Sequence, residues 1–315
     1  AIQDGFRSLG IVALGMYNRR QLYIRTADLN RDVSFFANGS LPVDDIDENI
    51  LEEADKHIIG FFFVCSSKAT VQISGSRSPI TAYEFLHNTF GEFLTAHFIL
   101  DIMFRLIKRQ IIDMEEEVSS WTEKLKMEWH ISLAYEPLFK RPVVLNMIHE
   151  LSEIIAEENG IRTVDVQTAL DKLFHEEIKH IITGSFFSEL NNTLCMQGNP
   201  FKHPELMVHV ATYSINLILL KSIVCSKSFN FTRKLGTDSD WHKLTYIWRY
   251  AFSEEDLAGL SWLITLNHTE KGIQLSYNFD EKVVQSAISL SKLDRLCRIS
   301  SVLGDDVSYA LFSVL

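Results

Sequence analysis

Residues 83–96 read YEFLHNTFGEFLTA, and the spacing of the apolar residues changes inside this segment. Up to His87 the bulky apolar side chains alternate with other residues, which is typical of a strand. From Phe90 onward they recur at helical spacing. Between the two patterns, Thr89 and Glu92 have the spacing of a capping box, in which each side chain binds the other residue's backbone N–H. The sequence therefore predicts a strand that ends at His87 and a long helix that begins at Thr89.

His87 is the residue of this segment with the clearest chemical potential. Its predicted position is beside a helix N-terminus, where N–H groups without intrahelical partners and the helix dipole favour an anion such as a phosphate. A histidine near a helix start is, however, more often a structural residue than a ligand contact. The residue alone leaves both interpretations open.

The same segment resembles the end of the winged-helix domain of NACHT-type STAND NTPases, a class that includes animal NLR sensors and bacterial antiviral NLR-like proteins. The family pattern F-[LIF]-H-x-[TS]-F-x-E-[FY] is matched from Phe85 to Phe93, and Ala96 matches as well. In that family the histidine contacts the β-phosphate of bound ADP and helps to hold a resting, closed state. The resemblance implies that His87 binds nucleotide and that ADP or ATP is the cofactor. The chain departs from the pattern at Gly91, where the family usually has glutamine.

A looser match to the family extends from this motif toward the chain start. Residues 6–18 have the pattern of a helix, and extended segments are predicted at 58–65, 69–74 and 83–87. Helices followed by a small antiparallel sheet make a winged helix. We therefore expect a winged-helix domain over residues 1–88.

Many winged helices bind DNA, and such a domain needs Lys and Arg on its recognition helix. The corresponding helix, predicted near residues 47–57, is acidic, and the whole chain has a formal net charge of −11. Both observations disfavour nucleic-acid and anionic-membrane binding. The acidic cluster itself is interpreted as a solvated helix rather than a cation site, because the EF-hand pattern is absent.

Residues 89–315 are predicted to form an α-helical sensor or relay region. Gly and Pro punctuate a series of amphipathic patterns, and two extended segments have the spacing of a hairpin. The clearest elements are helices at 143–158, 163–182 and 241–252, and strands at 261–266 and 272–277. The expected fold class is therefore mainly α, with a small winged-helix sheet followed by a helical domain or irregular helical array.

The most apolar long run, Met207 to Cys225, is long enough to cross a membrane. His209, Asn216 and Lys221 interrupt it, so we expect a buried core helix and no membrane association. Apolar residues make up 46% of the chain, which supports a sizeable core. The four cysteines are widely spaced and have no zinc-site spacing, which indicates reduced thiols and a cytoplasmic protein.

The chain lacks the glycine-rich and nucleophile motifs of common enzymes. It has no G-x-x-x-x-G-K-[ST], no G-x-G-x-x-G and no G-x-S-x-G. The segment HEEIKH at residues 175–180 separates its histidines by five positions rather than four, so they do not share a helix face and no metal site is predicted. We therefore do not expect this chain to be an enzyme by itself. If the resemblance holds, the NTPase domain lies upstream of residue 1.

The sequence supports one main functional hypothesis and two alternatives. By resemblance, the chain is the regulatory and sensor half of a NACHT-like STAND NTPase. It closes over ADP at rest and relays the binding of a ligand, such as a foreign protein, to homo-oligomerisation in antiphage defence. The first alternative is a winged-helix DNA-binding transcriptional regulator with an α-helical effector domain. The second is a helical hydrolase with dispersed catalytic groups, for which the available side chains are His175, His180, His203, His209 and Glu177.

Overall fold

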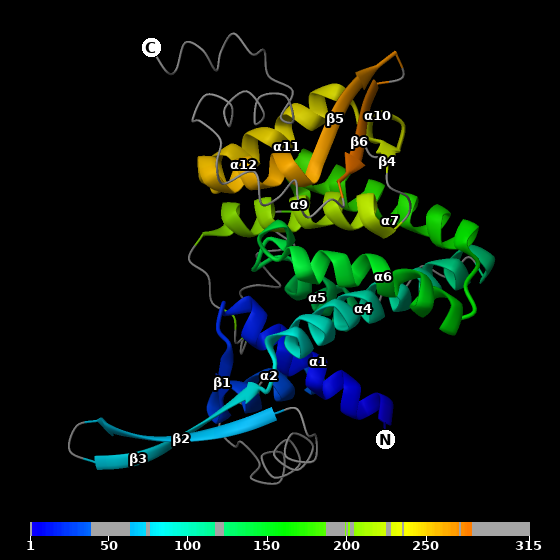
Figure 1. The fold of residues 1–315 in the computed structure, drawn as a ribbon. Coiled ribbons are helices and arrows are strands. Elements are labelled where there is room, and N and C mark those ends of the chain that lie inside the picture. Colours follow the sequence, from blue (N-terminus) through cyan, green and yellow to red (C-terminus); the bar gives the residue numbers. More distant parts are fainter. Residues whose placement is uncertain are drawn as a thin grey trace, which may run out of the picture.

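The computed structural model describes residues 2–38, 64–73, 76–116, 123–186, 199, 201, 205–224, 228–234, 236–270 and 272–278. The chain is mainly α-helical, with two small antiparallel sheets of three strands each, so the predicted fold class is confirmed (Figure 1). The acidic helix predicted near residues 47–57 and the last predicted helix after residue 278 lie outside the described residues.

The first elements follow the order of a winged helix. They are α1 (Ile2–Asn18), β1 (Tyr23–Arg25), α2 (Thr26–Asn38), β2 (Val64–Ile73) and β3 (Ser76–Phe85). β3 is the central strand and pairs antiparallel with both β1 and β2. The β2–β3 hairpin projects away from the helices, as a wing does (Figure 1).

The long helix α4 (Asn88–Glu116) leads from this part into the helical region. The helices that follow are α5 (Glu123–Leu133), the short 3-10 helix η1 (Leu138–Lys140), α6 (Pro142–Glu158), α7 (Thr163–Thr183), α9 (Leu206–Val224), α10 (Phe231–Lys234), α11 (Asp238–Ala251) and α12 (Glu254–Leu263). The second sheet has the order β4–β6–β5, built from β4 (Ser228–Asn230), β5 (Ile264–Thr269) and β6 (Gly272–Tyr277). The predicted C-terminal hairpin is therefore confirmed, with β5 beginning three residues later than expected.

Helix α1 joins the two parts of the molecule because it is buried on two faces. Val12 belongs to a small apolar cluster with β1, α2, β3 and the start of α4. Leu14 and Tyr17 belong to the main cluster, which continues through α4 to β6. A continuous hydrophobic core thus spans the division between residues 1–88 and 89–315, and that domain boundary stays a prediction.

Helix α9 is the central core helix of the second part, as predicted. It is the one helix among the described residues that is long and apolar enough to cross a membrane, and 83% of that stretch is buried in the protein. Among its polar side chains, Asn216 has the most complete set of protein partners. The Asn216 amide donates to the carbonyls of Leu133 and Glu136, both at 2.9 Å, and accepts from the Leu138 N–H at 2.7 Å. These bonds remove the cost of burying the amide and tie α9 to the turn between α5 and η1.

Gly15 allows α1 and α2 to approach each other closely. Arg19 on α1 donates two hydrogen bonds, 2.6 and 2.7 Å long, to the fully buried Asp32 carboxylate on α2. Burial raises the pKa of Asp32 to about 6, although the Arg19 bonds act in the opposite direction. A Cβ atom at residue 15 would overlap Asp32 Oδ2. The carboxylate position therefore depends on glycine at residue 15.

We predict that Gly15→Ala destabilises the protein, even though alanine favours a helix by about 1 kcal/mol over glycine. The new methyl group displaces a buried, paired carboxylate, and overpacking of this kind costs about 1–3 kcal/mol. Denaturant unfolding of the variant measures the change. Gly259→Ala in α12 is the matched control, because no atom lies within 4 Å of the point that its Cβ would occupy and the substitution is expected to stabilise. If both variants changed the free energy of unfolding by the same amount and in the same direction, this account would be contradicted.

Candidate functional site

His87 lies on the surface between the end of β3 and the start of α4. Its side chain is exposed, and its ring contacts Phe90 with a centroid separation of 6.2 Å. The backbone carbonyl of His87 accepts a hydrogen bond of 3.0 Å from the Phe90 N–H. The imidazole is therefore open to a partner that approaches the N-terminus of α4.

The structure corrects the predicted capping box. β3 ends at Phe85, two residues before the predicted end at His87, and α4 begins at Asn88, one residue before the predicted start at Thr89. Thr89 is inside the first helical turn and cannot be the N-cap residue, which lies outside the helix by definition. The reason is that the His87 carbonyl already accepts from the Phe90 N–H, which starts the helix one residue earlier. His87 itself thus occupies the position next to the helix.

The position of Phe85 explains why residue 91, where the family usually has glutamine, is a glycine in this chain. A Cβ at residue 91 would lie 3.0 Å from Phe85 Cδ2, and Phe85 is only 7% exposed. The Phe85 ring therefore covers the space that a larger side chain would need. The backbone carbonyl of Gly91 also accepts a 2.8 Å hydrogen bond from the Thr95 hydroxyl, which fixes the first turns of α4.

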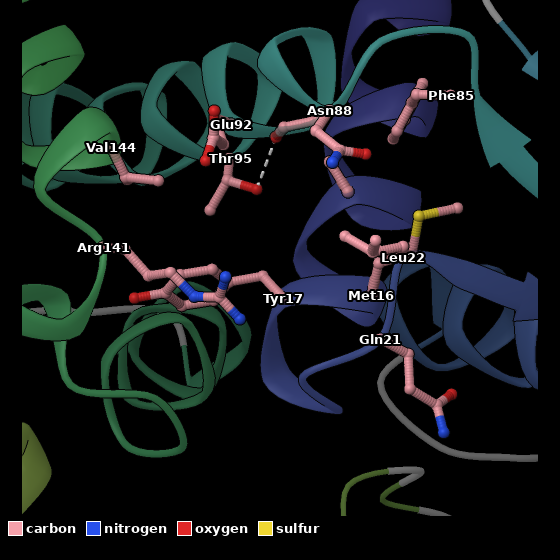
Figure 2. Close-up of a pocket in the computed structure, with 12 residues that line it drawn as sticks. Met16, Tyr17, Gln21, Leu22, Phe85, Asn88, Glu92, Thr95, Arg141 and Val144 are labelled. Atoms are coloured by element: carbon pink, nitrogen blue, oxygen red, sulfur yellow. Dashed lines mark hydrogen bonds between the residues drawn. The ribbon is translucent and has the colours of Figure 1, made fainter.

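A cavity of about 110 Å³ lies next to His87, between α1, the start of α4 and the start of α6. Figure 2 shows Asn88, Glu92 and Thr95 on α4 on one side of the cavity, with Tyr17 and Arg141 across from them. The rest of the lining is mostly apolar and consists of Ala13, Met16, Gln21, Leu22, Phe85, Gly91 and Val144. The exposed His87 thus directly precedes the helical turn whose residues Asn88, Gly91 and Glu92 line this cavity.

The charges at this cavity are one carboxylate and one guanidinium. Burial raises the pKa of Glu92, and the positive charge of Arg141 partly opposes that shift. Arg141 Nε also lies 3.6 Å from Glu136 Oε1, so it is shared between the cavity and a buried carboxylate. The cavity therefore connects the start of α4 to the interior ion pairs of the helical region.

The buried carboxylate of Glu136 binds the end of α1. Arg20 Nε donates to Glu136 Oε2 over 2.5 Å, and the Tyr17 hydroxyl donates to the Glu136 carbonyl over 3.3 Å. Glu136 is 3% exposed and Arg20 has a φ of 57°, in the left-handed region that non-glycine residues rarely adopt. Together with Arg141, these contacts satisfy a charge that would be costly to bury alone.

Two further contacts extend this junction. Asn18 Nδ2 donates to the Ile131 carbonyl over 3.2 Å, and the Arg19 guanidinium lies 4.6 Å from the centre of the Phe201 ring. Every residue from Tyr17 to Arg20 therefore contacts the helical region. We call this set of contacts the α1 junction. Sequence reasoning missed it, because Asn18 and Arg20 bind partners that are 113 and 116 positions away along the chain.

A second, larger cavity of about 550 Å³ lies between the N-terminal part of α1, the middle of α4 and the end of α6. Arg7 Nη2 donates to Glu128 Oε1 over 2.6 Å, and Glu128 is fully buried behind the cavity wall. Asp101 Oδ2 lies 3.7 Å from Arg7 and 3.6 Å from Arg105. Positive and negative charges alternate here, so the cavity has no marked preference for an anion or a cation.

The histidines considered for a hydrolytic site are not brought together. His175 and His180 are exposed on α7, whereas His209 is buried on α9 and its Nδ1 lies 2.7 Å from the Ala134 carbonyl. His203 lies outside the described residues. Over the part of the chain that the structure describes, no group of three or more His, Cys, Asp or Glu side chains could hold a metal ion.

Glu177 has a different role, at the centre of a buried polar cluster. The Tyr213 hydroxyl donates to Glu177 Oε2 over 3.0 Å, and His130 Nε2 lies 3.8 Å from the same oxygen. Burial raises the pKa of Glu177, but the neighbouring His130, Lys126 and Tyr213 together lower it by more, and the net shift is downward. The cluster joins α5, α7 and α9, and nothing in the spacing of these three residues predicts it.

We predict that the Arg20–Glu136 pair couples the two parts of the chain energetically. A double-mutant cycle of Arg20→Ala and Glu136→Gln, measured by denaturant unfolding, is expected to give a coupling energy of about 1–3 kcal/mol. The exposed pair Arg162–Asp165, 2.6 Å apart, is the control and is expected to couple far less because solvent screens it. Equal coupling in the two pairs would show that the α1 junction adds nothing beyond a surface ion pair.

We predict that Glu177→Gln lowers stability at neutral pH by about 1.5–3 kcal/mol, because it replaces the charged acceptor of the buried Tyr213 hydrogen bond by a neutral amide. A carboxyl whose folded-state pKa is lowered stabilises the fold above its unfolded pKa of about 4.3, and this stabilisation disappears as the pH falls. The difference between wild type and variant should therefore shrink between pH 7 and pH 3. A constant difference across that range, in unfolding curves at each pH, would refute this role.

Comparison with known proteins identifies no relative of this chain. No family model, curated protein or solved structure matches the chain. The functional argument therefore depends on the motif at residues 85–93 and on the geometry around His87.

Proposed function

We propose that this chain is the regulatory and sensor half of a NACHT-like STAND NTPase, which closes over ADP in the resting state. The observation that carries this proposal is the position of His87, exposed between the last strand of a winged-helix-like sheet and the start of α4. The order of α1, β1, α2, β2 and β3 supports it, because the same elements precede the histidine in a winged helix.

The surroundings of His87 suit a phosphate. Its imidazole is exposed, and the first-turn N–H groups of α4 lie beside it with the positive end of the helix dipole. Bound ADP supplies an anionic β-phosphate that accepts hydrogen bonds. His87 can donate an N–H to such an oxygen in either of its protonation states. In this proposal the nucleotide is held mainly by the NTPase domain that the resemblance implies, and His87 adds a contact to its β-phosphate.

The α1 junction gives this contact a physical route to the sensor region. α4 begins at the His87 site, packs against α1, and continues into the main core. Tyr17 at the end of α1 and Arg20 in the turn that follows bind Glu136, and the Glu136 carbonyl in turn accepts from Asn216 of α9. A ligand such as a foreign protein that binds the helical region and favours a different position of α1 weakens the His87 contact. The population then shifts to the open, oligomerising state.

The test is the ADP content and ADP release rate of the longer, NTPase-containing protein. His87→Ala removes one hydrogen bond to a charged group, worth about 1.5–3 kcal/mol, so ADP release is expected to accelerate about tenfold to hundredfold. Chromatography of the supernatant after denaturation measures co-purified ADP. The matched control is His175→Ala, which removes an exposed histidine from α7, away from this site.

Unchanged ADP content and release in His87→Ala would overturn the nucleotide role and leave His87 as a structural residue. Equal loss of ADP in both variants would point to general destabilisation instead. A cytoplasmic, antiphage role follows from the same proposal and has no support apart from it.

The alternative function is a winged-helix transcriptional regulator with a helical effector domain. The winged-helix order of elements is compatible with it, and the net charge of −11 is unfavourable to it. A salt-dependent mobility shift with duplex DNA, in a protein without co-purified nucleotide, would favour this alternative over the nucleotide switch.

A further inference from the structure

Helix α6 has an exposed face that alternates apolar and acidic side chains. At about 100° per residue, positions 143, 147, 150, 154 and 157 fall on one side of the helix. Val143 and Ile154 are 42% and 51% exposed, and the glutamates at 150 and 157 are exposed between and beyond them. Exposed aliphatic side chains flanked by charges are typical of a surface that contacts another protein.

The charged side chains of α6 are all acidic. α6 contains four exposed glutamates, at positions 150, 153, 157 and 158, and no Lys or Arg. Two of them are in the last turn, where the negative end of the helix dipole disfavours a carboxylate. Within the described part of the chain none of the four forms an ion pair. A positively charged partner would offset this unfavourable placement.

Helix α11 has an exposed face of the opposite character. Tyr246 and Tyr250 are 75% and 67% exposed, although tyrosine usually covers its ring. His242, Lys243 and Arg249 are exposed on the same side of the helix. Tyrosine and arginine are the residues that most often dominate the binding energy of protein interfaces.

We propose that the α6 face of one copy of this chain binds the α11 face of a second copy. Ile154 would pack against Tyr246 and Tyr250, and Glu150 and Glu157 would lie opposite Lys243 and Arg249. The two charged pairs span similar lengths of helix, about 10 Å on α6 and about 9 Å on α11 at about 1.5 Å per residue, and their charges have opposite signs. This contact is independent of the proposed nucleotide switch.

The proposed contact joins two different surfaces of the molecule. α6 and α11 both pack on α9, and they lie on different sides of it (Figure 1). The two faces are therefore different patches of one molecule, and each copy can use both. A pair of helices buries little area, so the affinity is expected at the weak end of specific interfaces.

Sedimentation velocity over a concentration series of the purified chain tests the contact. Wild type is expected to self-associate, less so at about 1 M salt, where charges are screened beyond about 3 Å. Tyr246→Ala with Tyr250→Ala is expected to weaken association about tenfold or more. Association should also fall in Glu150→Lys with Glu157→Lys, and in Lys243→Glu with Arg249→Glu, because each double variant brings like charges together.

The decisive measurement is a mixture of the two charge variants. Each alone is expected to be monomeric, but together they present opposite charges at both contacts and should associate as wild type does. The control is Glu176→Lys, which reverses an exposed charge on α7, outside both of these faces. It should leave association unchanged. Monomeric wild type at all concentrations, or two variants that fail to associate when mixed although circular dichroism shows both folded, would overturn the contact.

Discussion

The buried carboxylate of Glu136 requires charged partners, and much of the architecture supplies them. An unpaired carboxylate in a protein interior costs several kcal/mol, so Arg20 and Arg141 must both approach it. Arg20 lies in the turn between α1 and β1, and Arg141 directly precedes α6. Because both arginines contact Glu136, they hold the start of β1 near the start of α6. The left-handed backbone at Arg20 is held by the same contact.

Local patterns in the sequence predicted most of the helices and the C-terminal hairpin, because each depends on the spacing of neighbouring residues. The apolar run at α9 was correctly interpreted as a core helix because His209, Asn216 and Lys221 interrupt it. The capping box failed because Thr89 and Glu92 have the right spacing but the His87 carbonyl already starts the helix. β4 has three residues, too few for any periodic pattern to identify it.

Contacts between distant parts of the chain could not be predicted. Arg20 and Glu136 are 116 positions apart, and no property of either residue indicates the other. The same holds for His130, Glu177 and Tyr213, which come together only because three helices cross. The candidate site divides in the same way. His87 was found from its motif, whereas the neighbouring cavity, formed by side chains from three helices, follows only from the fold.

The hydrogen bonds of Asn216 have a consequence for the synthesis of this protein. The carbonyls of Leu133 and Glu136 and the N–H of Leu138 all bond to a side chain that follows them by about 80 positions. At translation rates of about 5–20 residues per second, this turn waits about 4–16 s for α9 to leave the ribosome. During that interval the surfaces of α5 and α6 that later cover α9 are exposed to solvent, and the nascent chain is most vulnerable to aggregation at this stage.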